Sequence, residues 1–358
     1  MSRITYFDFT NIIYSAIYVN GFMENADEYG YEFAVSHKVP PEIADVDPPS
    51  WLAKMNPYTL FRYEGEEQEP FFFCTYSGDM NGSEEADDGY YEPFLKRFKY
   101  FFKVNYNSDV IAQSEKLNRY AAKIKPVPVG FPIALEKPWR LRPQIGRPGW
   151  SRLAIKNRIR RLTRTVSLDK YRRLRQIDED LDLFFLIRLY AMPGYEEENE
   201  RRRNLIDLIN KKMDRFNILV KYSQIDKQPD ADWGTNEIAV MPHRDVLNNY
   251  ARSRVGLYIR GLHGCLSFKF GELMALGKPI AGESLLNNRE NMYKYDHFGE
   301  QFAYDDPEEL VDRIIYLLKH PDYREELKQA NIETFENSFT PKPVTQYILD
   351  QMSIQRSR

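Results

Sequence analysis

The sequence predicts an α/β protein with two domains, and three observations support that prediction. The chain has 358 residues, enough for two domains of ordinary size with a hydrophobic core each. Apolar strand-like runs alternate with helix-like stretches through residues 179–340, the pattern of a parallel sheet with helices on its faces. Hydrophobic residues make up 42% and charged residues 29% of the chain, which is the composition of a globular protein.

Residues 1–133 predict a first, less regular α/β domain. The run Phe71, Phe72 and Phe73 is typical of a strand buried on both faces. Prolines between residues 40 and 57 indicate a loop. We expect strands at residues 3–9, 31–36, 60–62, 69–76 and 102–106, and helices at residues 12–28 and 90–101.

Residues 179–340 predict the second domain, a doubly wound sheet. We expect strands at residues 181–190, 217–223, 255–260, 278–282 and 301–304, and helices at residues 196–213, 244–253, 268–276 and 307–319. Residues 321–358 are expected to complete the chain as helices, with residues 341–358 as a separate last segment. In such a sheet, ligands bind beyond the carboxyl ends of the strands.

The most informative segment, residues 251–284, predicts a strand, a glycine-containing loop, a helix and a strand. Gly261 and Gly264 interrupt the apolar run, Ser267 offers an N-cap oxygen, and Gly277 is placed to end the helix. The unsatisfied N–H groups and the dipole of a helix N-terminus favour an anion in such a loop. The segment therefore predicts a phosphate-binding site.

The side chains around this loop suit a nucleoside-diphosphate sugar. Lys269 and Glu272 are three residues apart on one helix face, where a cation can meet phosphate and a carboxylate can accept from sugar hydroxyls. Arg254 and Arg260 compete with Lys269 for the phosphates, and Arg260 ends the strand beside the loop. His263 could donate to the leaving phosphate or fill the loop. The alternative for Glu272 is a solvated glutamate paired with Lys269.

This segment resembles the donor-binding half of GT-B-fold glycosyltransferases, in particular the exostosin-like, protein O-glucosyltransferase-like and fucosyltransferase-like groups. The resemblance extends over residues 243–331 and rests on Gly261, Gly264, Ser267, Lys269, Glu272, Ala275, Gly277 and Pro279. It implies two Rossmann-like domains that face each other across a cleft, a nucleotide-sugar donor held by residues 179–340, and a last helix that returns to the first domain. The next glutamate after Glu272 is Glu283, too far along for a retaining signature, which favours an inverting reaction.

An inverting transfer needs a base to take the proton of the acceptor hydroxyl, and the resemblance implies that the first domain supplies it. Asp79 follows the aromatic strand in a glycine-flanked turn and is the first candidate. His37 and Asp8, after the second and first strands, are alternatives, and Asp79 could also be only a turn residue. No clustered metal-ligand spacing is present, so we expect neither metal nor cofactor beyond the donor itself.

Residues 134–178 form a basic linker between the two domains. Residues 140–175 contain eleven arginines and two lysines against the single Asp169. Apolar residues recur there at helical spacing, namely Ile155, Ile159, Leu162 and Val166. One interpretation is an interdomain helix whose arginines pair with the acidic residues 64–92. The other is a surface helix in which residues 150–175 contact an anionic membrane.

Composition also bounds the cellular setting. Cys74 and Cys265 are too few for a disulfide framework, which favours a reducing compartment. The first residues lack an apolar signal segment, and no apolar run reaches the length of a membrane span. We therefore expect a cytoplasmic protein, in contact with the inner face of the membrane if the basic helix binds lipid. An isoelectric point near 6.1 argues against a nucleic-acid partner.

The leading hypothesis is a metal-independent glycosyltransferase. It would move a sugar from a nucleoside-diphosphate sugar to a hydroxyl of a glycan or glycan-lipid, as in polysaccharide biosynthesis. The first alternative is a non-catalytic nucleotide- or sugar-binding protein of the same fold, because the base is not identified with certainty by sequence. A second alternative, a nucleotide-sugar epimerase, requires carboxylate and histidine clusters that the sequence does not show.

Overall fold

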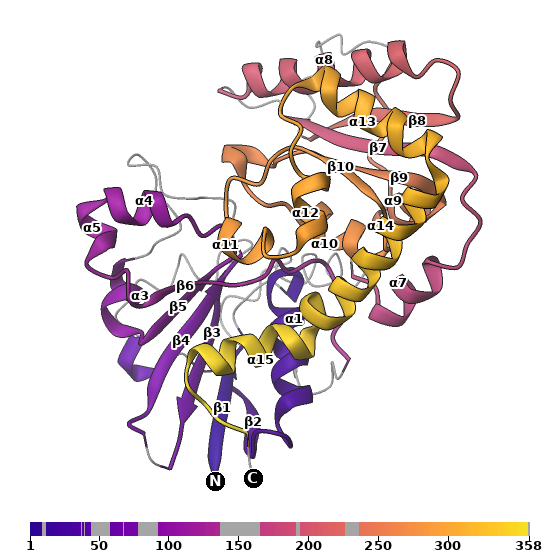
Figure 1. Ribbon diagram of the computed structural model, residues 1–358. Coiled ribbons are helices and arrows are strands. Elements are labelled where there is room, and N and C mark those ends of the chain that lie inside the picture. Colours follow the sequence, from indigo (N-terminus) through magenta and orange to yellow (C-terminus); the bar gives the residue numbers. More distant parts are fainter. Residues whose placement is uncertain are drawn as a thin grey trace.

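The computed structural model contains two α/β domains, one above the other in Figure 1. It describes residues 1–8, 12–36, 38, 40–43, 58–66, 68–77, 92–136, 165–190, 194–225 and 236–356. Each domain is built on its own sheet, and both ends of the chain lie at the base of the N-terminal domain (Figure 1). The prediction of a two-domain α/β protein is confirmed.

The N-terminal domain has a six-stranded mixed sheet. Its strands, in spatial order, are β2 (Tyr31–Ser36), β1 (Ser2–Phe7), β3 (Tyr58–Glu64), β4 (Phe71–Tyr76), β5 (Tyr100–Lys103) and β6 (Ile124–Pro126). Only β3 runs antiparallel to its neighbours, and the other adjacent pairs among these strands are parallel. Five strands therefore end at one edge of the sheet, where Asp8, Ser77 and Val104 follow them.

The helices of this domain are shorter than the sequence indicates. They are α1 (Ile12–Asn25), α3 (Glu92–Arg97), α4 (Ser108–Gln113) and α5 (Glu115–Asn118), with a 3-10 turn at Pro41–Ile43. The helix expected over residues 90–101 was wrong at its end, because Tyr100 pairs with Phe73 as the first residue of β5. Pairing with β4 buries Phe101 and Phe102 completely, and this burial outweighs local helix preference. All six residues of β4 are buried, as predicted for its aromatic run.

The C-terminal domain has a four-stranded, all-parallel sheet. Its spatial order is β10 (Ile280–Gly282), β9 (Ser253–Tyr258), β7 (Leu181–Tyr190) and β8 (Ile218–Ile225). The chain moves from β7 outward to β8 and then crosses to β9 on the other side, so the strand order reverses between β7 and β9. A reversal of this kind opens a crevice at the carboxyl ends of the two strands.

Helices cover both faces of this sheet. Residues of α8 (Glu196–Lys212) and α13 (Pro307–Lys319) share one hydrophobic cluster with alternate residues of β7, such as Phe185. Residues of α9 (His243–Arg252) and α10 (Phe268–Ala275) pack with Phe184 on the opposite face. Three further helices are α7 (Leu168–Leu174), α11 (Arg289–Met292) and α12 (Asp296–Gln301).

The strand expected at residues 301–304 is reduced to one isolated bridge between Gly282 and Phe302. Gln301 is instead the last residue of α12, and its side chain accepts one hydrogen bond that a neighbouring strand would otherwise accept. Its Oε1 accepts from the N–H of Ile280 at 2.8 Å. A buried amide therefore replaces a ladder hydrogen bond at the edge of the sheet.

The last helix returns to the N-terminal domain, as the resemblance implied. After α14 (Pro321–Thr334) and a π-helical turn at Phe335–Phe339, α15 (Pro341–Gln351) packs along α1. The two helices approach closely at Gly21, where a Cβ atom would lie 2.0 Å from the carbonyl oxygen of Pro341. Asn25 Nδ2 donates to the carbonyl of Lys342 at 2.9 Å and to Thr345 Oγ1 at 2.7 Å.

The carboxyl edges of the two sheets face each other. Asn105, after β5, accepts from the N–H of Leu266 at 2.7 Å. Asn288, after β10, donates its N–H to the carbonyl of Tyr106 at 2.6 Å and its side-chain amide to Val127 at 2.7 Å. These contacts join the loops where ligands of both sheets are expected, which is the GT-B-like arrangement of two α/β domains.

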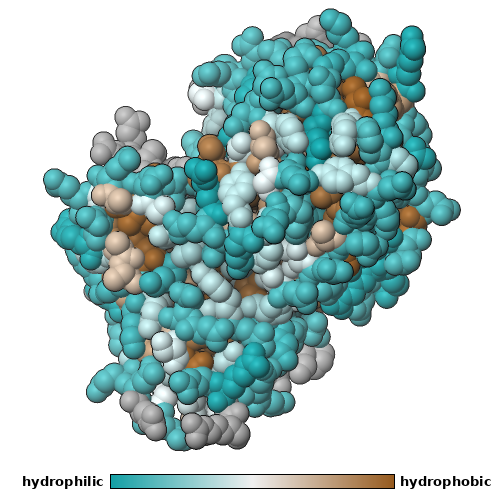
Figure 2. Space-filling view, viewed as in Figure 1, coloured by the Kyte–Doolittle hydropathy of each residue, from teal (hydrophilic) through white to brown (hydrophobic). Residues whose placement is uncertain are grey.

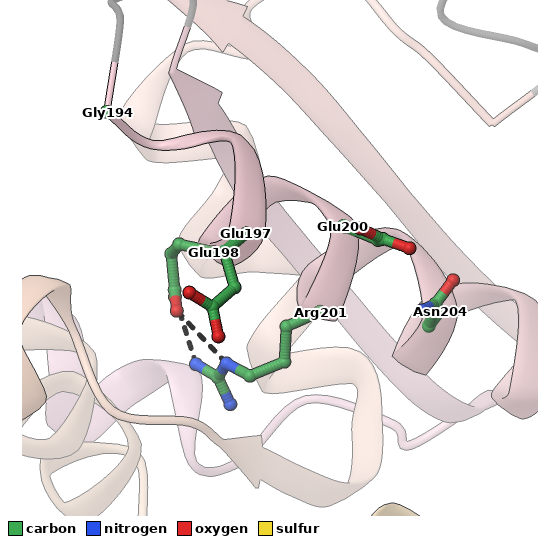
Figure 3. Close-up of a pocket in the computed structure, with 6 residues that line it drawn as sticks. All are labelled: Gly194, Glu197, Glu198, Glu200, Arg201 and Asn204. Atoms are coloured by element: carbon green, nitrogen blue, oxygen red, sulfur yellow. Dashed lines mark hydrogen bonds and ion pairs between the residues drawn. The ribbon is translucent and has the colours of Figure 1, made fainter.

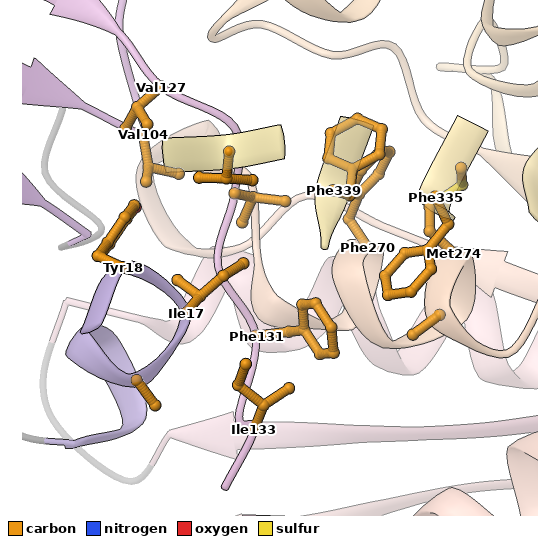
Figure 4. Close-up of a cluster of buried hydrophobic side chains, with 14 of the residues drawn as sticks. Ile17, Tyr18, Val104, Val127, Phe131, Ile133, Phe270, Met274, Phe335 and Phe339 are labelled. Atoms are coloured by element: carbon orange, nitrogen blue, oxygen red, sulfur yellow. The ribbon is translucent and has the colours of Figure 1, made fainter. Parts of the chain in front are cut away.

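One hydrophobic cluster runs through both domains at this junction (Figure 4). Phe131, in the segment after β6, lies between Ile17 of α1 and the residues of α10 (Figure 4). A Cβ atom on Gly271 would be 2.9 Å from the Phe131 side chain, so α10 and this segment are in direct contact. The shared core fixes the position of α10 relative to the N-terminal domain.

The outer surface is mostly hydrophilic on the face shown in Figure 2, with hydrophobic side chains in small separate patches. Among the residues that the structure describes, no helix is long and apolar enough to span a bilayer. Both cysteines are buried, and they are not joined in a disulfide.

Candidate functional site

The loop between β9 and α10 is a tight turn that needs its glycines. Gly264 has a φ of 70° and His263 before it a φ of 57°, so two successive residues are left-handed. The N–H of Gly261 donates to the carbonyl of Cys265 at 2.9 Å. A Cβ atom on Gly261 would lie 2.3 Å from the Cys265 sulfur, so another residue there would displace the Cys265 side chain. The predicted glycine loop therefore stands at the carboxyl end of β9, beside the strand-order reversal.

Helix α10 begins directly after this loop. Ser267 occupies the N-cap position, but its side chain makes no capping hydrogen bond, so the predicted N-cap oxygen was wrong. The first turn of α10 is therefore not closed by its own cap, and its dipole favours an anion there. The helix ends as predicted at Gly277, whose φ is 65° and whose N–H donates to Met274 at 2.9 Å.

Glu272 lies one turn into α10 and is buried, with 7% of its surface exposed. Its Oε1 is 2.6 Å from Nε2 of His243, the first residue of α9. The alternative of a solvated glutamate paired with Lys269 was therefore wrong. Burial, and secondarily the charge of Glu272, raise the pKa values of Tyr171 and Tyr250 well above their ordinary range. The carboxylate thus sits between α7, α9 and α10.

Lys269 is a cation without a carboxylate partner among the described residues. Its Nζ donates to the carbonyl of Leu186 at 3.0 Å and lies 4.4 Å above the ring of Phe185. The pKa of Lys269 is lowered to about 7, chiefly by burial; the charge of Glu272 opposes this shift, and the charges of Arg202 and Arg188 add to it. A bound anion would favour the charged form of this lysine.

Two arginines near the carboxyl end of β7 add to this positive region. Arg188 is exposed and lies two residues before the last residue of β7. Arg202, on α8, is buried and donates to the carbonyl of Arg188 at 2.7 Å and to Glu198 at 2.6 Å. Neither arginine was predicted as a site residue, although a basic residue at the end of a strand and another in the following helix are visible in the sequence.

Arg260 is held by acidic residues. Its N–H donates to Glu283 at 2.7 Å, and its guanidinium lies 3.3 Å from Glu283 and 3.1 Å from Asp305. Arg201 of α8 pairs with the same Glu283 from the other side. Glu283 and Asp305 therefore pair with Arg260 at the carboxyl edge of the sheet, and its contact with a donor phosphate stays a prediction.

A pocket of about 470 Å³ opens beside Arg201 at the start of α8. Figure 3 shows Arg201 turned toward Glu198, which it meets at 2.9 Å. The lining residues are Gly194, Glu197, Glu198, Glu200, Arg201 and Asn204. Its lining is acidic, so this pocket does not suit a diphosphate.

Arg254 is not brought to the loop. It lies at the amino end of β9, where its guanidinium is 2.5 Å from Asp182 in β7. The Gly261 loop follows the carboxyl end of the same strand, so Arg254 is at the opposite edge of the sheet. The prediction that Arg254 could grip the donor phosphates is corrected by this placement.

The predicted bases are mostly outside the described residues. Asp79 and His37 both fall there, as do Ile155, Ile159 and Leu162 of the basic segment. Asp8 is described: its N–H donates to Ser36 at 2.9 Å, and its Oδ1 accepts from Tyr6 at 3.3 Å. It stands at the edge of the N-terminal sheet that faces the C-terminal domain. Among the described residues, no group of three or more His, Cys, Asp or Glu side chains could hold a metal ion.

A family comparison matches residues 201–350 to the model described as glycosyl transferase-like. No curated protein sequence matches the chain. Three solved structures with a similar backbone are Staphylococcus aureus TarM in complex with UDP, WaaG of lipopolysaccharide biosynthesis, and T4 phage β-glucosyltransferase.

The identities to these structures are 8%, 10% and 12%, and the TM-scores are 0.46, 0.42 and 0.41. The alignments cover 78%, 97% and 94% of this chain, and 50%, 97% and 92% of the three structures. This chain thus spans half the length of the TarM chain.

Proposed function

We propose that this chain, whose residues 201–350 match a glycosyl transferase-like model and whose two α/β domains are arranged in a GT-B-like way, transfers a sugar from a nucleoside-diphosphate sugar to a hydroxyl of a glycan or glycan-lipid. One observation carries the proposal. The uncapped start of α10, the unpaired Lys269 and the buried Glu272 meet at the carboxyl edge of the second sheet, next to the reversal of strand order.

In the proposal, the donor diphosphate lies at the first turn of α10. The dipole at the first turn of α10 would favour the negative charge, and Lys269 would supply a nearby cation. Arg188 stands close enough to Lys269 to lower its pKa, and would contribute from the end of β7. Because these groups provide positive charge themselves, we propose that the reaction proceeds without a metal ion.

Glu272 would accept hydrogen bonds from hydroxyl groups of the ribose or of the donor sugar. His243 is a positioning residue in this proposal, because its ring holds one carboxylate oxygen at 2.6 Å and leaves the other for the ligand. Its contact with Glu272 joins residues 29 positions apart, which no local spacing reveals.

In the proposed chemical step, the donor and the acceptor lie between the facing edges of the two sheets. The acceptor hydroxyl oxygen would attack the anomeric carbon while the bond to the diphosphate breaks, and the nucleoside diphosphate would leave with the electron pair. A base on the N-terminal domain would take the hydroxyl proton. Asp79 is our first candidate for that base, with His37 and Asp8 as alternatives, and attack from the face opposite the phosphate would invert the anomeric carbon.

The test is a donor screen followed by a turnover assay. UDP-, GDP-, CMP- and dTDP-sugars are added to the full chain, and the correct donor should raise the melting temperature, since a ligand of the native state stabilises it. Nucleotide release in the presence of glycan acceptors then measures transfer. If no nucleotide sugar shifts the melting temperature, the donor site is misassigned. If donors bind but no acceptor supports turnover, the chain is a nucleotide-sugar-binding protein, the alternative that shares this fold.

A further inference from the structure

A second pocket lies where the linker meets the C-terminal domain. Its volume is about 290 Å³. The residues that line it are Thr165, Val166, Ser167, Lys170, Arg173 and Arg244. Five of them belong to α7 and the segment directly before it, and Arg244 comes from the first turn of α9.

The cations of this pocket have no carboxylate partner among the residues that the structure describes. On the other side of α7, Arg172 and Arg175 each lie 2.8 Å from Glu336. Lys170, Arg173 and Arg244, in contrast, form no ion pair with any carboxylate of the described residues, and the lining contains none. The positive charge on one face of α7 is therefore paired with Glu336, and the cations on the other face line the pocket without a carboxylate partner in the described part of the chain.

The backbone of this pocket is fixed from two sides. Val166 forms a bridge with Ile133, and its carbonyl accepts from the N–H of Ala134 at 2.9 Å. Ser167 caps α7 by accepting from the N–H of Lys170 at 3.2 Å, which leaves the hydroxyl hydrogen to donate. The pocket is thus built on ordered backbone at the junction of the two domains.

The pocket adjoins the proposed donor site. Arg244 directly follows His243, whose ring holds Glu272. Tyr171 of α7 lies near Glu272 as well. The pKa of Tyr171 is raised by burial and, secondarily, by the charge of this carboxylate. A molecule whose hydroxyl reaches the donor could therefore place a second group among these cations.

We propose that this pocket binds a phosphate group of the acceptor, so that the enzyme acts on a phosphate-bearing glycan or glycan-lipid. Two guanidinium groups and one ammonium from two elements suit an anion with several oxygens, since arginine grips phosphate in a bidentate manner. This inference rests on the proposed function, because it gives the substrate class of the same reaction.

The experiment measures binding of glycerol phosphate and inorganic phosphate to the full chain by calorimetry at low ionic strength. A Lys269→Met background removes the lysine of the donor site, so that phosphate reports on the pocket. We expect saturable binding, weakened at least about tenfold by each of Arg173→Gln and Arg244→Gln, because each removes a charge-assisted hydrogen bond. The control is Arg215→Gln, an exposed arginine outside both sites, which should leave phosphate binding unchanged.

Nucleotide-sugar binding to the Arg173→Gln/Arg244→Gln double variant separates this inference from the proposed function. We expect donor affinity to stay within about twofold, as a pair on another site should not couple strongly. Transfer to a phosphate-bearing acceptor should fall through a higher KM, and transfer to an uncharged analogue should not change.

Three results would overturn the inference. Phosphate binding that the double variant retains would place the anion elsewhere, and a matching loss of donor affinity would assign the cations to the donor. Binding to phosphatidylglycerol vesicles without binding to glycerol phosphate would assign them to a membrane surface. The proposed function fails by a different result, the absence of nucleotide-sugar binding in the wild type.

Discussion

Replacing Lys269 by methionine removes one buried charge and keeps the length of the side chain. In the folded protein the pKa of Lys269 is lowered to about 7, while the unfolded chain keeps the ordinary value near 10.4. Below pH 7 both states hold the proton, and burial of the charge costs stability. Between pH 7 and pH 10 the unfolded state binds more protons, so this cost decreases as pH rises. The variant should therefore be the more stable protein at pH 6, by on the order of a few kcal/mol.

Donor binding should depend on pH in the opposite direction: affinity should be higher at low pH, where Lys269 is protonated. The two phosphates of a nucleotide sugar are diesters that stay ionised from pH 6 to pH 9, so Lys269 is the group that must gain a proton. At pH 8, one unit above its pKa, protonation of the lysine costs about 1.4 kcal/mol, and donor affinity should be about tenfold weaker than well below pH 7. Binding at pH 8 should take up about 0.9 protons per donor.

Calorimetry in two buffers of different ionisation enthalpy measures that uptake directly. The Lys269→Met variant should bind the donor weakly at every pH and take up no proton. Lys211→Met, at an exposed lysine of α8, is the matched control and should keep the wild-type profile. A wild-type affinity that is flat from pH 6 to pH 9, or a methionine variant that keeps the slope, would refute the assignment of Lys269 to the phosphates.

Four further outcomes are expected. Glu272→Gln should leave the melting temperature nearly unchanged and weaken donor binding by about 1–3 kcal/mol in calorimetry, and an unchanged affinity would remove Glu272 from the site. Donor binding and turnover should survive EDTA, whereas strict dependence on Mn²⁺ or Mg²⁺ in the rate assay would contradict the proposed mechanism. Gly21→Ala should lower the free energy of unfolding by about 1–3 kcal/mol in urea titrations, because its Cβ would meet Pro341; a neutral result would mean that α15 shifts freely. If the basic segment contacts lipid, sedimentation with anionic vesicles should fade with salt and with joint replacement of Arg158, Arg160, Arg161 and Arg164, while the absence of wild-type binding would favour the linker interpretation.

Sequence reasoning was accurate where one regular pattern decides the structure. The bounds of β7 and α13 agree with the prediction because long apolar periodicity and the Asp306 cap define them. The turn at Gly277 was predictable from a single glycine with positive φ. The helix over residues 90–101 failed because local preference carries no information about pairing with β4.

The sequence predicts which residues gather at the site, but it does not predict which side chains contact one another there. Lys269, Glu272 and the glycine loop occur within a dozen residues, so their proximity follows from the chain itself. The partners of Glu272 and Arg260, however, are His243 and Glu283, which only the folded sheet brings near. Arg254 shows the opposite case. It is only six residues from Arg260 in the sequence, but the extended strand β9 places the two residues at opposite edges of the sheet.

The return of α15 to α1 sets an order for the biosynthesis of this protein. The N-terminal domain emerges from the ribosome first, and its strands can pair as soon as residue 126 is free. Yet the face of α1 around Gly21 and Asn25 is covered by Pro341–Gln351, which is translated more than 200 residues later. Until α15 has been synthesised, this face of α1 is not covered by it. The core of the N-terminal domain is therefore complete only after the last helix of the chain has packed against α1.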